Sequence, residues 1–441
     1  MNTSIAVIIL AAGKGTRMKS SLPKVLHPLA NRPMILHILD TVEHLNPEHT
    51  VVITGHEADA VETEIHKDYP NAVCIRQTEQ LGTGHAVLQA KEALEDFNGT
   101  TLILNGDVPL IKSQALADFI GKHRSSSRTV TMASTLVADP TGLGRIIRND
   151  DGAFITNKEH KDCSPEEHDI SEVNVGLYAV DNQHLFNLLS KISNDNIQQE
   201  YYLPDIAAIG LADGLTVDAD FFDQPPEELG GINDRLQLAE AEMFLQDRYR
   251  TMHMLNGVTL QDPATTYFSW DTQLGKDITI GQQVVFGPRV TVKDETTILP
   301  FSHLEGCSVG TSCRVGPFAR LRPEAILQER ARVGNFSEIK KATLGKASKV
   351  NHLSYVGDAT IGDDCNIGAG TVFANYDHHK KRKHHADVGH NVAIGANSVI
   401  VAPASVGDHV KIGAGTVIRK DVEGDMLVVD KTEQVNKSIK S

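Results

Sequence analysis

The chain has 441 residues, of which 40% are hydrophobic and 22% are charged. This length exceeds what a single core usually requires, so we expect two or three globular domains. The net charge of −15 excludes a general nucleic-acid-binding protein, because such proteins present a basic surface.

The N-terminal apolar run covers residues 5–12 and no basic segment precedes it. We therefore expect a buried first strand here and not a signal peptide. No apolar stretch is long enough to cross a bilayer, so we expect no membrane insertion. Five scattered cysteines without a CxxC pair favour a reducing, cytoplasmic setting over a disulfide framework or a zinc site.

Residues 1–230 alternate short apolar runs with helical patterns. The runs AVIIL (6–10), VVIT (51–54), AVCI (72–75) and TLILN (101–105) predict strands, whereas HAVLQAKEAL (85–94) is typical of a helix. This alternation predicts an α/β domain with a mostly parallel, Rossmann-like sheet. Such sheets bind ligands at the carboxyl ends of their strands.

A glycine-containing turn follows the first predicted strand, in LAAGKGTRMKSSLPKVL (10–26). Gly13 and Gly15 allow the backbone to approach a ligand, and Lys14, Arg17 and Lys24 supply positive charge, so the turn suits a pyrophosphate. It matches neither the Rossmann GxGxxG nor the P-loop pattern. The alternative is a tight turn without a ligand.

Residues 231–255 separate the first domain from a third region, 256–441. The segment 233–255 lacks glycine and proline and carries apolar residues at helical spacing, which predicts one long connecting helix. Pro-Pro at 225–226 and Gly-Gly at 230–231 mark the boundary before it.

From residue 280 onward an apolar residue recurs every six positions, with a few single-residue slips and one longer gap. A glycine follows many of these residues directly. The apolar positions are Ile280, Phe286, Val292, Ile298, Leu304, Val309, Val315, Leu321, Leu327, Val333, Ile339, Leu344, Val350, Val356, Ile361, Ile367, Phe373, Val388, Ile394, Ile400, Val406, Ile412 and Ile418.

This hexapeptide period predicts a parallel β-helix in which one apolar residue of every six points inward. With three hexapeptides per coil, the repeat predicts between seven and eight coils. An ordinary β-sandwich is the alternative, but it predicts alternation with a period of two. The repeat resembles the left-handed β-helix of hexapeptide acyltransferases.

Two features interrupt the repeat. Arg322 and Lys340 occupy a position that glycine usually holds, and their spacing of one coil predicts that they stack on one edge, where an anion would offset their repulsion. Ordinary solvated charges are the alternative. The segment 374–387 predicts an extruded loop, whose cations at 380–383 suit a phosphate partner.

The turn at 10–26 is similar to the signature of sugar-1-phosphate nucleotidyltransferases. Further segments narrow the resemblance: QTEQLGTGHA (77–86), NGDVPL (105–110), TGLGRI (141–146), EHKD (159–162), EVNVG (172–176), EYYLPD (200–205) and GINDRLQL (231–238). Over nearly its whole length the chain resembles the bifunctional N-acetylglucosamine-1-phosphate uridyltransferase/glucosamine-1-phosphate N-acetyltransferases.

The resemblance implies uridylyl transfer from UTP to N-acetylglucosamine-1-phosphate in the first domain, with Mg2+ neutralising phosphate charge. Asp107 ends a predicted strand where a carboxylate suits a metal ion, and the resemblance adds Asn233 as its partner ligand. It assigns the catalytic phosphate contacts to Lys24 and Arg17. The further implied nucleotide and sugar contacts are Leu10, Ala11, Ala12, Gly13, Gln77, Gly82, Thr83, Gly144, Glu159 and Asn174.

For the β-helix, the resemblance implies acetyl transfer from acetyl-CoA to glucosamine-1-phosphate. It makes His352 the general base, a role that suits a group with a pKa near neutrality. It assigns the acceptor sugar to Arg322, Lys340, Tyr355 and Asn366. The acetyl-CoA contacts that it implies are Asn375, Tyr376, Ala396, Ala414 and Lys431.

The family also implies a homotrimer with acetyltransferase sites at subunit interfaces. This chain departs from the family pattern in both halves, and the β-helix lacks about one coil before residue 316. We expect these changes to alter the sugar pocket and the CoA site and to leave the phosphate and metal groups in place. The substituted positions are Asn105, Leu143, Val175, Glu324, Ala396 and Lys431.

Two other functions are compatible with parts of the sequence. A single-activity pyrophosphorylase also joins an α/β domain to a β-helix, but it would lack His352 in its NHLSY context and the extruded loop. A noncatalytic regulatory or assembly subunit would lose its phosphate cations or its metal carboxylate, and this chain keeps Lys24, Arg17 and Asp107.

Overall fold

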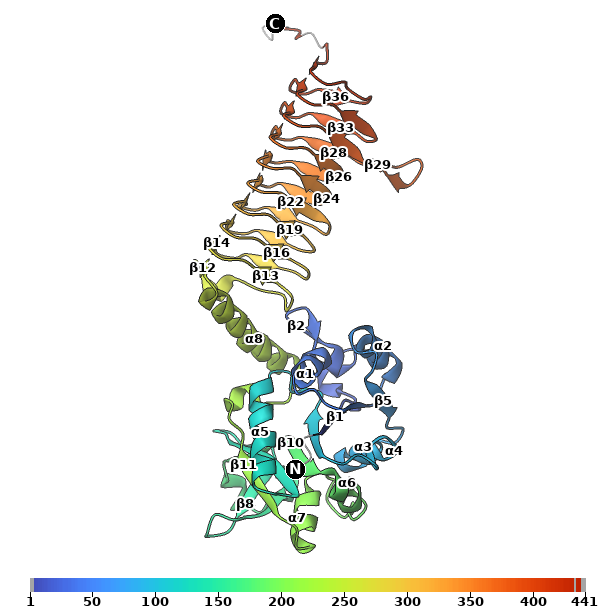
Figure 1. The fold of residues 1–441 in the computed structure, drawn as a ribbon, viewed down its shortest axis with the longest axis vertical. Helices are drawn as coiled ribbons and strands as arrows, with labels where there is room; N and C mark the ends of the chain where they lie inside the picture. Colours follow the sequence, from blue (N-terminus) through green and yellow to red (C-terminus); the bar gives the residue numbers. More distant parts are fainter. Residues whose placement is uncertain (1–3, 432–433, 438–441) are drawn as a thin grey trace. The chain divides into compact units, whose positions relative to one another are not determined.

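The computed structural model describes residues 4–431 and 434–437 and divides into two compact units, residues 1–244 and 245–441 (Figure 1). The division falls within helix α8 (Arg235–Leu255). The extreme ends of the predicted ranges 1–230 and 256–441 lie outside the described residues. No helix in the described part of the chain is long and apolar enough to cross a membrane.

The first unit is built on a nine-stranded sheet with a central row β11-β7-β10-β6-β1-β4-β5. Neighbours in this row are parallel, except that β10 runs antiparallel to both β6 and β7, so the row is mostly parallel as expected. Off the row, β8 pairs antiparallel with β9 and β10. The strands of this unit are β1 Ile5–Leu10, β2 Pro28–Leu29, β3 Arg32–Pro33, β4 His49–Thr54, β5 Val73–Arg76, β6 Thr100–Asn105, β7 Val130–Leu136, β8 Arg145–Arg148, β9 Phe154–Lys158, β10 Glu172–Asp181 and β11 Val217–Phe221.

Helices cover both faces of this sheet. In β1, Ala6 and Ile8 pack into one apolar cluster and Val7 and Ile9 into another, which explains the uninterrupted apolar run of this strand. The helices are α1 Met34–Glu43, α2 Ala58–Asp68, α3 Thr83–Leu88, α4 Lys91–Leu94, α5 Ser113–Ser125, α6 Asn182–Leu189 and α7 Asp205–Ala212, with short 3-10 turns at Thr16–Met18, Lys24–Leu26, His160–Asp162, Glu167–Asp169 and Pro226–Glu228.

The second unit is the predicted left-handed parallel β-helix, seen in Figure 1 as a stack of short parallel strands. A 3-10 turn at Pro263–Thr265 lies near its start. Its strands are β12 Val258–Leu260, β13 Gln273–Leu274, β14 Ile278–Ile280, β15 Val285–Phe286, β16 Thr291–Val292, β17 Thr297–Ile298, β18 His303–Leu304, β19 Ser308–Val309, β20 Arg314–Val315, β21 Arg320–Leu321, β22 Ala325–Leu327, β23 Arg332–Asn335, β24 Glu338–Leu344, β25 Lys349–His352, β26 Tyr355–Ile361, β27 Asn366–Ile367, β28 Val372–Ala374, β29 Tyr376–Asp377, β30 Arg382–Lys383, β31 Ala386–Val388, β32 Ala393–Ile394, β33 Val399–Val401, β34 Ala404–Val406, β35 Lys411–Ile412, β36 Val417–Ile418 and β37 Leu427–Val428.

Each apolar residue of the hexapeptide repeat is buried in one continuous core, which confirms the predicted inward positions. The stack contains more coils than the seven to eight that the repeat predicts. One face carries ten strands, because β12 and β37 extend the stack beyond the first and last hexapeptides that the sequence shows. We call this ten-stranded face, which includes β23, β25 and β27, face 1.

The other two faces share a sheet because two strands bend across a corner of the coil. Face 2 contains β21, the first half of β24, the first half of β26, and β28. Face 3 contains β19, β22, the second halves of β24 and β26, and β31. At the bends, Lys341 and Asp358 take left-handed backbone angles, with φ of 46° and 49°.

The repeat glycines do not supply those left-handed corners. Gly345, which follows the inward Leu344, stands close to the next coil, so that a Cβ there would lie 2.4 Å from the carbonyl oxygen of Gly362. Glycine therefore permits coils to stack closely at this position, while Lys341 and Asp358 form the left-handed corners at the bends of β24 and β26.

Candidate active sites

A cavity of about 540 Å3 lies in the first unit, at the carboxyl ends of β1 and β6. The segments directly before β8 and directly after β9, together with β10, supply its other side. The structure therefore brings together predicted residues from distant segments, as the position of ligands in open α/β sheets requires. The predicted residues that line the cavity are Leu10, Arg17, Thr83, Asp107, Gly144, Glu159, Asn174 and Asn233.

Lys24 links the predicted metal ligands. Its Nζ donates to Asp107 Oδ2 at 2.5 Å and to Asn233 Oδ1 at 3.0 Å. Its side chain and that of Asp107 are only 13% and 18% exposed. A backbone bond from Ile232 N to Asp107 O ties the segment before α8 to the end of β6, and this bond places Asn233 opposite the carboxylate.

The two oxygens that hold the Lys24 ammonium are suitable ligands for a divalent cation. Asp107 supplies a carboxylate and Asn233 an amide oxygen, the donor types that Mg2+ accepts. Among the described residues, no group of three or more His, Cys, Asp or Glu side chains forms a closed metal site. The residues therefore fit a metal ion that substrate phosphates help to hold.

The turn after β1 places Gly15 against Lys24. Gly15 has φ of +59°, and a Cβ there would lie 2.6 Å from Lys24 Cβ, so both the backbone angle and the space require glycine. Arg17 lies in the short turn that follows, and the backbone of that turn accepts a hydrogen bond from Arg235 Nε at Met18 O. The turn and α8 thus hold the cations near the cavity.

The far wall of the cavity contains the predicted amino-sugar contacts. The backbone NH of Asn174 donates to Gly144 O, while its side-chain amide donates to Tyr178 Oη at 2.7 Å. An irregularity in the β10–β7 register between Asn174 and Tyr178 turns this part of β10 toward the cavity. Burial raises the pKa of Glu159 above its usual value.

The remaining predicted nucleotide contacts lie beside this cavity. Gln77 lines a neighbouring hollow of about 520 Å3, and its Nε2 donates to Gly82 O at 3.2 Å. The carbonyl of Ala12 accepts from Gln80 Nε2. The predicted residues outside the lining of the larger cavity are Ala11, Ala12, Gly13, Lys24, Gln77 and Gly82.

Sequence analysis did not identify Arg145, which is buried beside the cavity wall that contains Gly144 and Glu159. Its guanidinium donates to the backbone carbonyls of Pro140 and His168, so it fixes the segments that carry Gly144 and Glu159. Its position directly after Gly144 in GLGR was the available signal. Three departures from the family pattern, at Asn105, Leu143 and Val175, line the same cavity.

In the β-helix, Arg322 and Lys340 stack at the corner between faces 2 and 3, as their spacing predicted. Arg322 Nη1 lies 2.8 Å from Glu338 Oε1. The pKa of Lys340 is lowered, first because the side chain of Lys383 contacts it and then by desolvation and the charge of Arg322. Like charges held together in this way would be stabilised by an anion between them.

The structure identifies Lys383 as the cation of the extruded loop that reaches this cluster. The loop forms a hairpin of β29 and β30, which projects from the coil in Figure 1. At its base, Asn375 Nδ2 donates to the buried Asp358 Oδ2 at 2.6 Å, and Lys383 Nζ lies 4.0 Å from the same carboxylate. Sequence alone did not distinguish Lys383 from the cations at 380–382.

His352 lies at the other edge of face 2, at the end of β25. Its Nδ1 lies 2.8 Å from Asn335 Oδ1 on the preceding coil. Tyr355 begins the strand that follows, and its Oη accepts a hydrogen bond of 3.4 Å from Asn375 Nδ2. Asn366 lies on β27, the strand next to β25 on face 1, so the structure brings it within one coil of His352.

Two of the predicted acetyl-CoA residues, Ala396 and Ala414, continue the column of His352 toward the C-terminus. Gly370 N donates to His352 O, Asn397 N to Ala369 O, and Gly415 N to Ala396 O, so Ala396 and Ala414 occupy equivalent positions on later coils. Both alanines are exposed, as are Tyr376 in the hairpin and Lys431, which follows the last strand. A row of small residues therefore leads away from His352.

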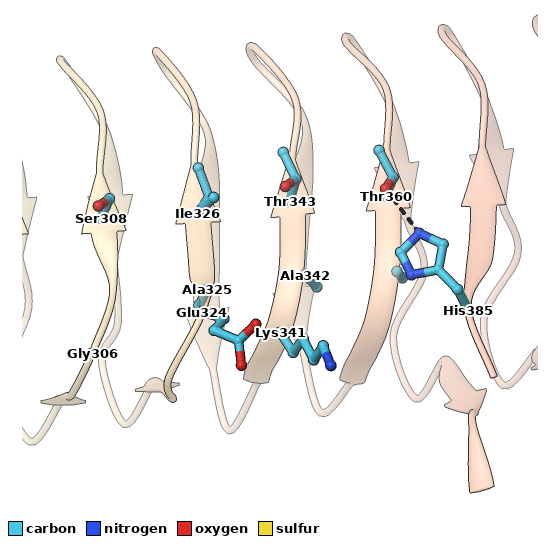
Figure 2. Close-up of a pocket in the computed structure, with 11 residues that line it drawn as sticks. Gly306, Ser308, Glu324, Ala325, Ile326, Lys341, Ala342, Thr343, Thr360 and His385 are labelled. Carbon is cyan, nitrogen blue, oxygen red and sulfur yellow. Dashed lines mark hydrogen bonds between the residues drawn. The ribbon is translucent and has the colours of Figure 1, made fainter. Parts of the chain in front are cut away.

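A shallow groove of about 440 Å3 lies on face 3 and contains none of the predicted catalytic or binding residues, but the substituted position Glu324 lines it. Figure 2 shows Ser308, Ile326, Thr343 and Thr360 in one row across successive coils. The dashed line in Figure 2 joins Thr360 Oγ1 to His385 Nε2 at 2.9 Å. This contact fixes the chain where it leaves the hairpin and returns to the coil.

Comparison with known proteins agrees with the division of the chain into two units. Residues 6–224 match the nucleotidyl transferase family, residues 359–373 match the hexapeptide repeat of succinyl-transferase, and residues 385–420 match the bacterial transferase hexapeptide of six repeats. The chain is similar to the bifunctional protein GlmU of Dinoroseobacter shibae, with 49% identity over 98% of this chain and 95% of that protein. Similar matches are found with the GlmU proteins of Roseobacter denitrificans (45% identity, 98% and 94% coverage) and Geobacillus thermodenitrificans (40% identity, 98% and 96% coverage).

Proposed function

The chain belongs to the family of bifunctional GlmU proteins, and from this membership we propose how its two sites divide the synthesis of UDP-N-acetylglucosamine. The β-helix transfers an acetyl group from acetyl-CoA to glucosamine-1-phosphate. The N-terminal unit then joins the resulting N-acetylglucosamine-1-phosphate to UTP and releases pyrophosphate.

In the N-terminal site, Lys24 and Arg17 bind the phosphates, while Glu159, Asn174 and Gly144 bind the amino sugar. Asp107 and Asn233 hold Mg2+. When bound, the ion neutralises the negative charge that develops on the phosphates during transfer. The side chains thus position the sugar phosphate for attack on the α-phosphorus of UTP.

In the β-helix, Arg322, Lys340 and Lys383 bind the phosphate of the acceptor sugar. Tyr355 lies on face 2 between this cluster and His352, and Asn366 lies on the coil next to His352. His352 takes a proton from the amine of glucosamine-1-phosphate as the amine nitrogen attacks the acetyl carbonyl. CoA then departs as the thiolate. The acetyl-CoA contacts are Asn375, Tyr376, Ala396, Ala414 and Lys431.

The cation cluster at the edge of face 2 is the observation that most strongly supports two activities. Glu338 pairs with Arg322 at 2.8 Å, but Lys383 Nζ lies 4.0 Å from Asp358 and lowers the pKa of Lys340. A β-helix that serves only assembly has no need of this excess of cations, which a bound anion would stabilise. A single-activity pyrophosphorylase would leave this cluster and His352 without a substrate.

One experiment tests both halves of the proposal. The purified chain should convert glucosamine-1-phosphate, acetyl-CoA and UTP into UDP-N-acetylglucosamine when Mg2+ is present. Mass spectrometry identifies the product after each co-substrate is omitted in turn. Formation of UDP-N-acetylglucosamine only from preformed N-acetylglucosamine-1-phosphate would reduce the chain to a single-activity enzyme.

We also propose a cytoplasmic homotrimer. The five cysteines are free, which suits a reducing compartment. The flat faces and projecting hairpin of the β-helix suit side-by-side packing of parallel copies. Sedimentation equilibrium of the full chain should give three times its mass of 48.0 kDa, and a single-chain mass at micromolar concentration would contradict the trimer.

A further inference from the structure

The ring of His352 faces an amide on the coil before it. Asn335 and His352 end the neighbouring strands β23 and β25 and are direct partners in their parallel register. The Nδ1 atom of His352 and the Oδ1 atom of Asn335 lie 2.8 Å apart. This contact joins side chains that are 17 positions apart in the sequence, about one coil.

We propose that Asn335 is a positioning residue that holds His352 in the tautomer with its proton on Nδ1. An amide oxygen accepts hydrogen bonds and does not donate them, so the contact requires a hydrogen on Nδ1. The lone pair of Nε2 is then free to accept a proton. This inference deepens the proposed function, because it rests on the role of His352 as the base.

The column of residues around His352 supports this role. Register places Pro317 before Asn335, and Ala369 after His352, on successive coils. Ala369 offers the ring a methyl group, so in this column the polar neighbour of His352 is Asn335. The backbone of His352 is fixed separately, because its carbonyl accepts from Ser354 Oγ at 2.7 Å and from Gly370 N at 3.2 Å.

The proposed tautomer suits the direction of proton transfer. Nε2 takes the proton that the amine loses as the new nitrogen–carbon bond forms, and the sulfur–carbon bond of acetyl-CoA breaks to release the thiolate. The ring then carries a positive charge. Its Nδ1–H group still donates a hydrogen bond to Asn335 Oδ1, and the partial negative charge of that oxygen stabilises the cation.

The test compares Asn335→Ala and Asn335→Asp with the unchanged chain. Asn335→Ala should lower kcat for acetylation by about 10- to 100-fold, as loss of a partner that orients a histidine commonly does, and leave KM nearly unchanged. Asn335→Asp restores the acceptor and adds a negative charge that favours protonated His352. Its acidic limb of kcat against pH should therefore move up by about one unit or more.

The titratable side chains on the strands around His352 are the same in all variants, so their effects cancel in the comparison. They are Arg332, Glu338, Lys349 and Tyr355. Asn391→Ala makes the same chemical change at another corner of the β-helix and should leave both activities unchanged. Uridylyl transfer, measured on each preparation, reports the fold of the first unit, and thermal unfolding reports that of the β-helix.

Nitrogen-15 NMR of labelled histidine gives a direct readout, with the His352 signal assigned by its loss in His352→Gln. The proton should reside on Nδ1 in the unchanged chain, and the tautomers should mix in Asn335→Ala. A proton on Nε2 in the unchanged chain would overturn the inference. The inference would also be overturned if Asn335→Ala kept the kcat and pH profile of the unchanged chain while His352→Ala was inactive. Acetylation by His352→Ala would instead overturn the proposed role of His352 as the base. If Asn335→Ala does not fold, the pH profile of Asn335→Asp decides.

Discussion

The two sites of this chain are assembled in opposite ways. In the N-terminal unit, Lys24 contacts Asp107 across 83 positions of the sequence and Asn233 across 209. In the β-helix, Asn335 contacts His352 across 17 positions, and Asp358 contacts Asn375 across the same interval. Tertiary folding of a mixed sheet builds the first site, whereas the repeat length of a coil builds the second.

This difference indicates how each site responds to change. A residue of the first site depends on several elements that meet once, at the ends of β1 and β6. A residue of the second depends chiefly on the coils directly above and below it, because each repeat contacts its neighbours. Substitutions should therefore separate the two activities, and the β-helix should be sensitive to its stacking positions.

The largest separation should come from His352→Ala. This change removes the proposed base, and loss of a general base typically lowers the rate by about 10^2- to 10^4-fold. Acetylation of glucosamine-1-phosphate should fall by this factor, while uridylyl transfer from UTP to N-acetylglucosamine-1-phosphate should persist. Both rates are measured on one preparation. Loss of both in a folded protein would show that the sites are coupled.

The reciprocal change is Asp107→Ala. It removes a carboxylate that lies 2.5 Å from Lys24 and that we propose binds Mg2+. Uridylyl transfer should fall by about 100-fold or more, as loss of preorganised charge stabilisation commonly causes, and acetylation should not change. Rates are measured over a range of Mg2+ concentrations. Near-normal Mg2+-dependent turnover would exclude Asp107 as the ligand.

The stacking of coils can be tested by Gly334→Ala. A Cβ at this position would lie 2.0 Å from the carbonyl oxygen of Asn351, so the coils must separate. We expect the free energy of unfolding of the β-helix to fall by roughly 1 to 3 kcal/mol. Fluorescence of Trp270, the single tryptophan, follows this unit during urea denaturation. An unchanged midpoint would show that the stack adjusts without cost.

Gly121→Ala provides the matched control in the first unit. Gly121 lies in α5, and a Cβ there would meet no atom within 4 Å. The same change should therefore stabilise the first unit by roughly 0.5 to 1 kcal/mol, because alanine favours helix. Circular dichroism of α-helix content follows it, and the Trp270 transition should stay in place.

A smaller effect on activity than those of His352→Ala and Asp107→Ala distinguishes the cations of the hairpin. Lys383→Met removes the ammonium that contacts Lys340, and we expect the KM for glucosamine-1-phosphate to rise about tenfold, the loss of one surface-exposed charge–phosphate contact of about 1.4 kcal/mol. Lys380→Met should leave KM unchanged. The reverse result would show that the hairpin rearranges when substrate binds.

The sequence predicted more of the second site than of the first. The six-residue period identified one buried residue of each hexapeptide but missed a second buried series two positions earlier, which includes Val284, Val290 and Val392. The one-coil spacing of Arg322 and Lys340 predicted that they stack along one edge. The same arithmetic would have paired Asn335 with His352. It failed at Lys383, because the hairpin interrupts the period and its fold depends on a contact with Asp358.

In the first unit, local sequence predicted strands and the phosphate turn but not the partners of that turn. Nothing in the spacing of Lys24, Asp107 and Asn233 relates them, since the order of strands in the sheet decides which loops meet. Only the family resemblance joined Asp107 to Asn233. The buried Arg145, which holds two loops through their carbonyls, depends equally on tertiary structure.

Because successive coils stack as closely as Gly345 and Gly362 do, the β-helix can change its length only by whole coils. Removal of one whole coil, for example 17 residues, returns every side chain to its former column, so a shorter chain keeps the same sites at a different height. Removal of three residues instead would rotate all later columns and carry Ala396 away from His352. This domain therefore accepts insertions and deletions as complete coils or as hairpins at a corner, such as the one between Ala374 and Ala386.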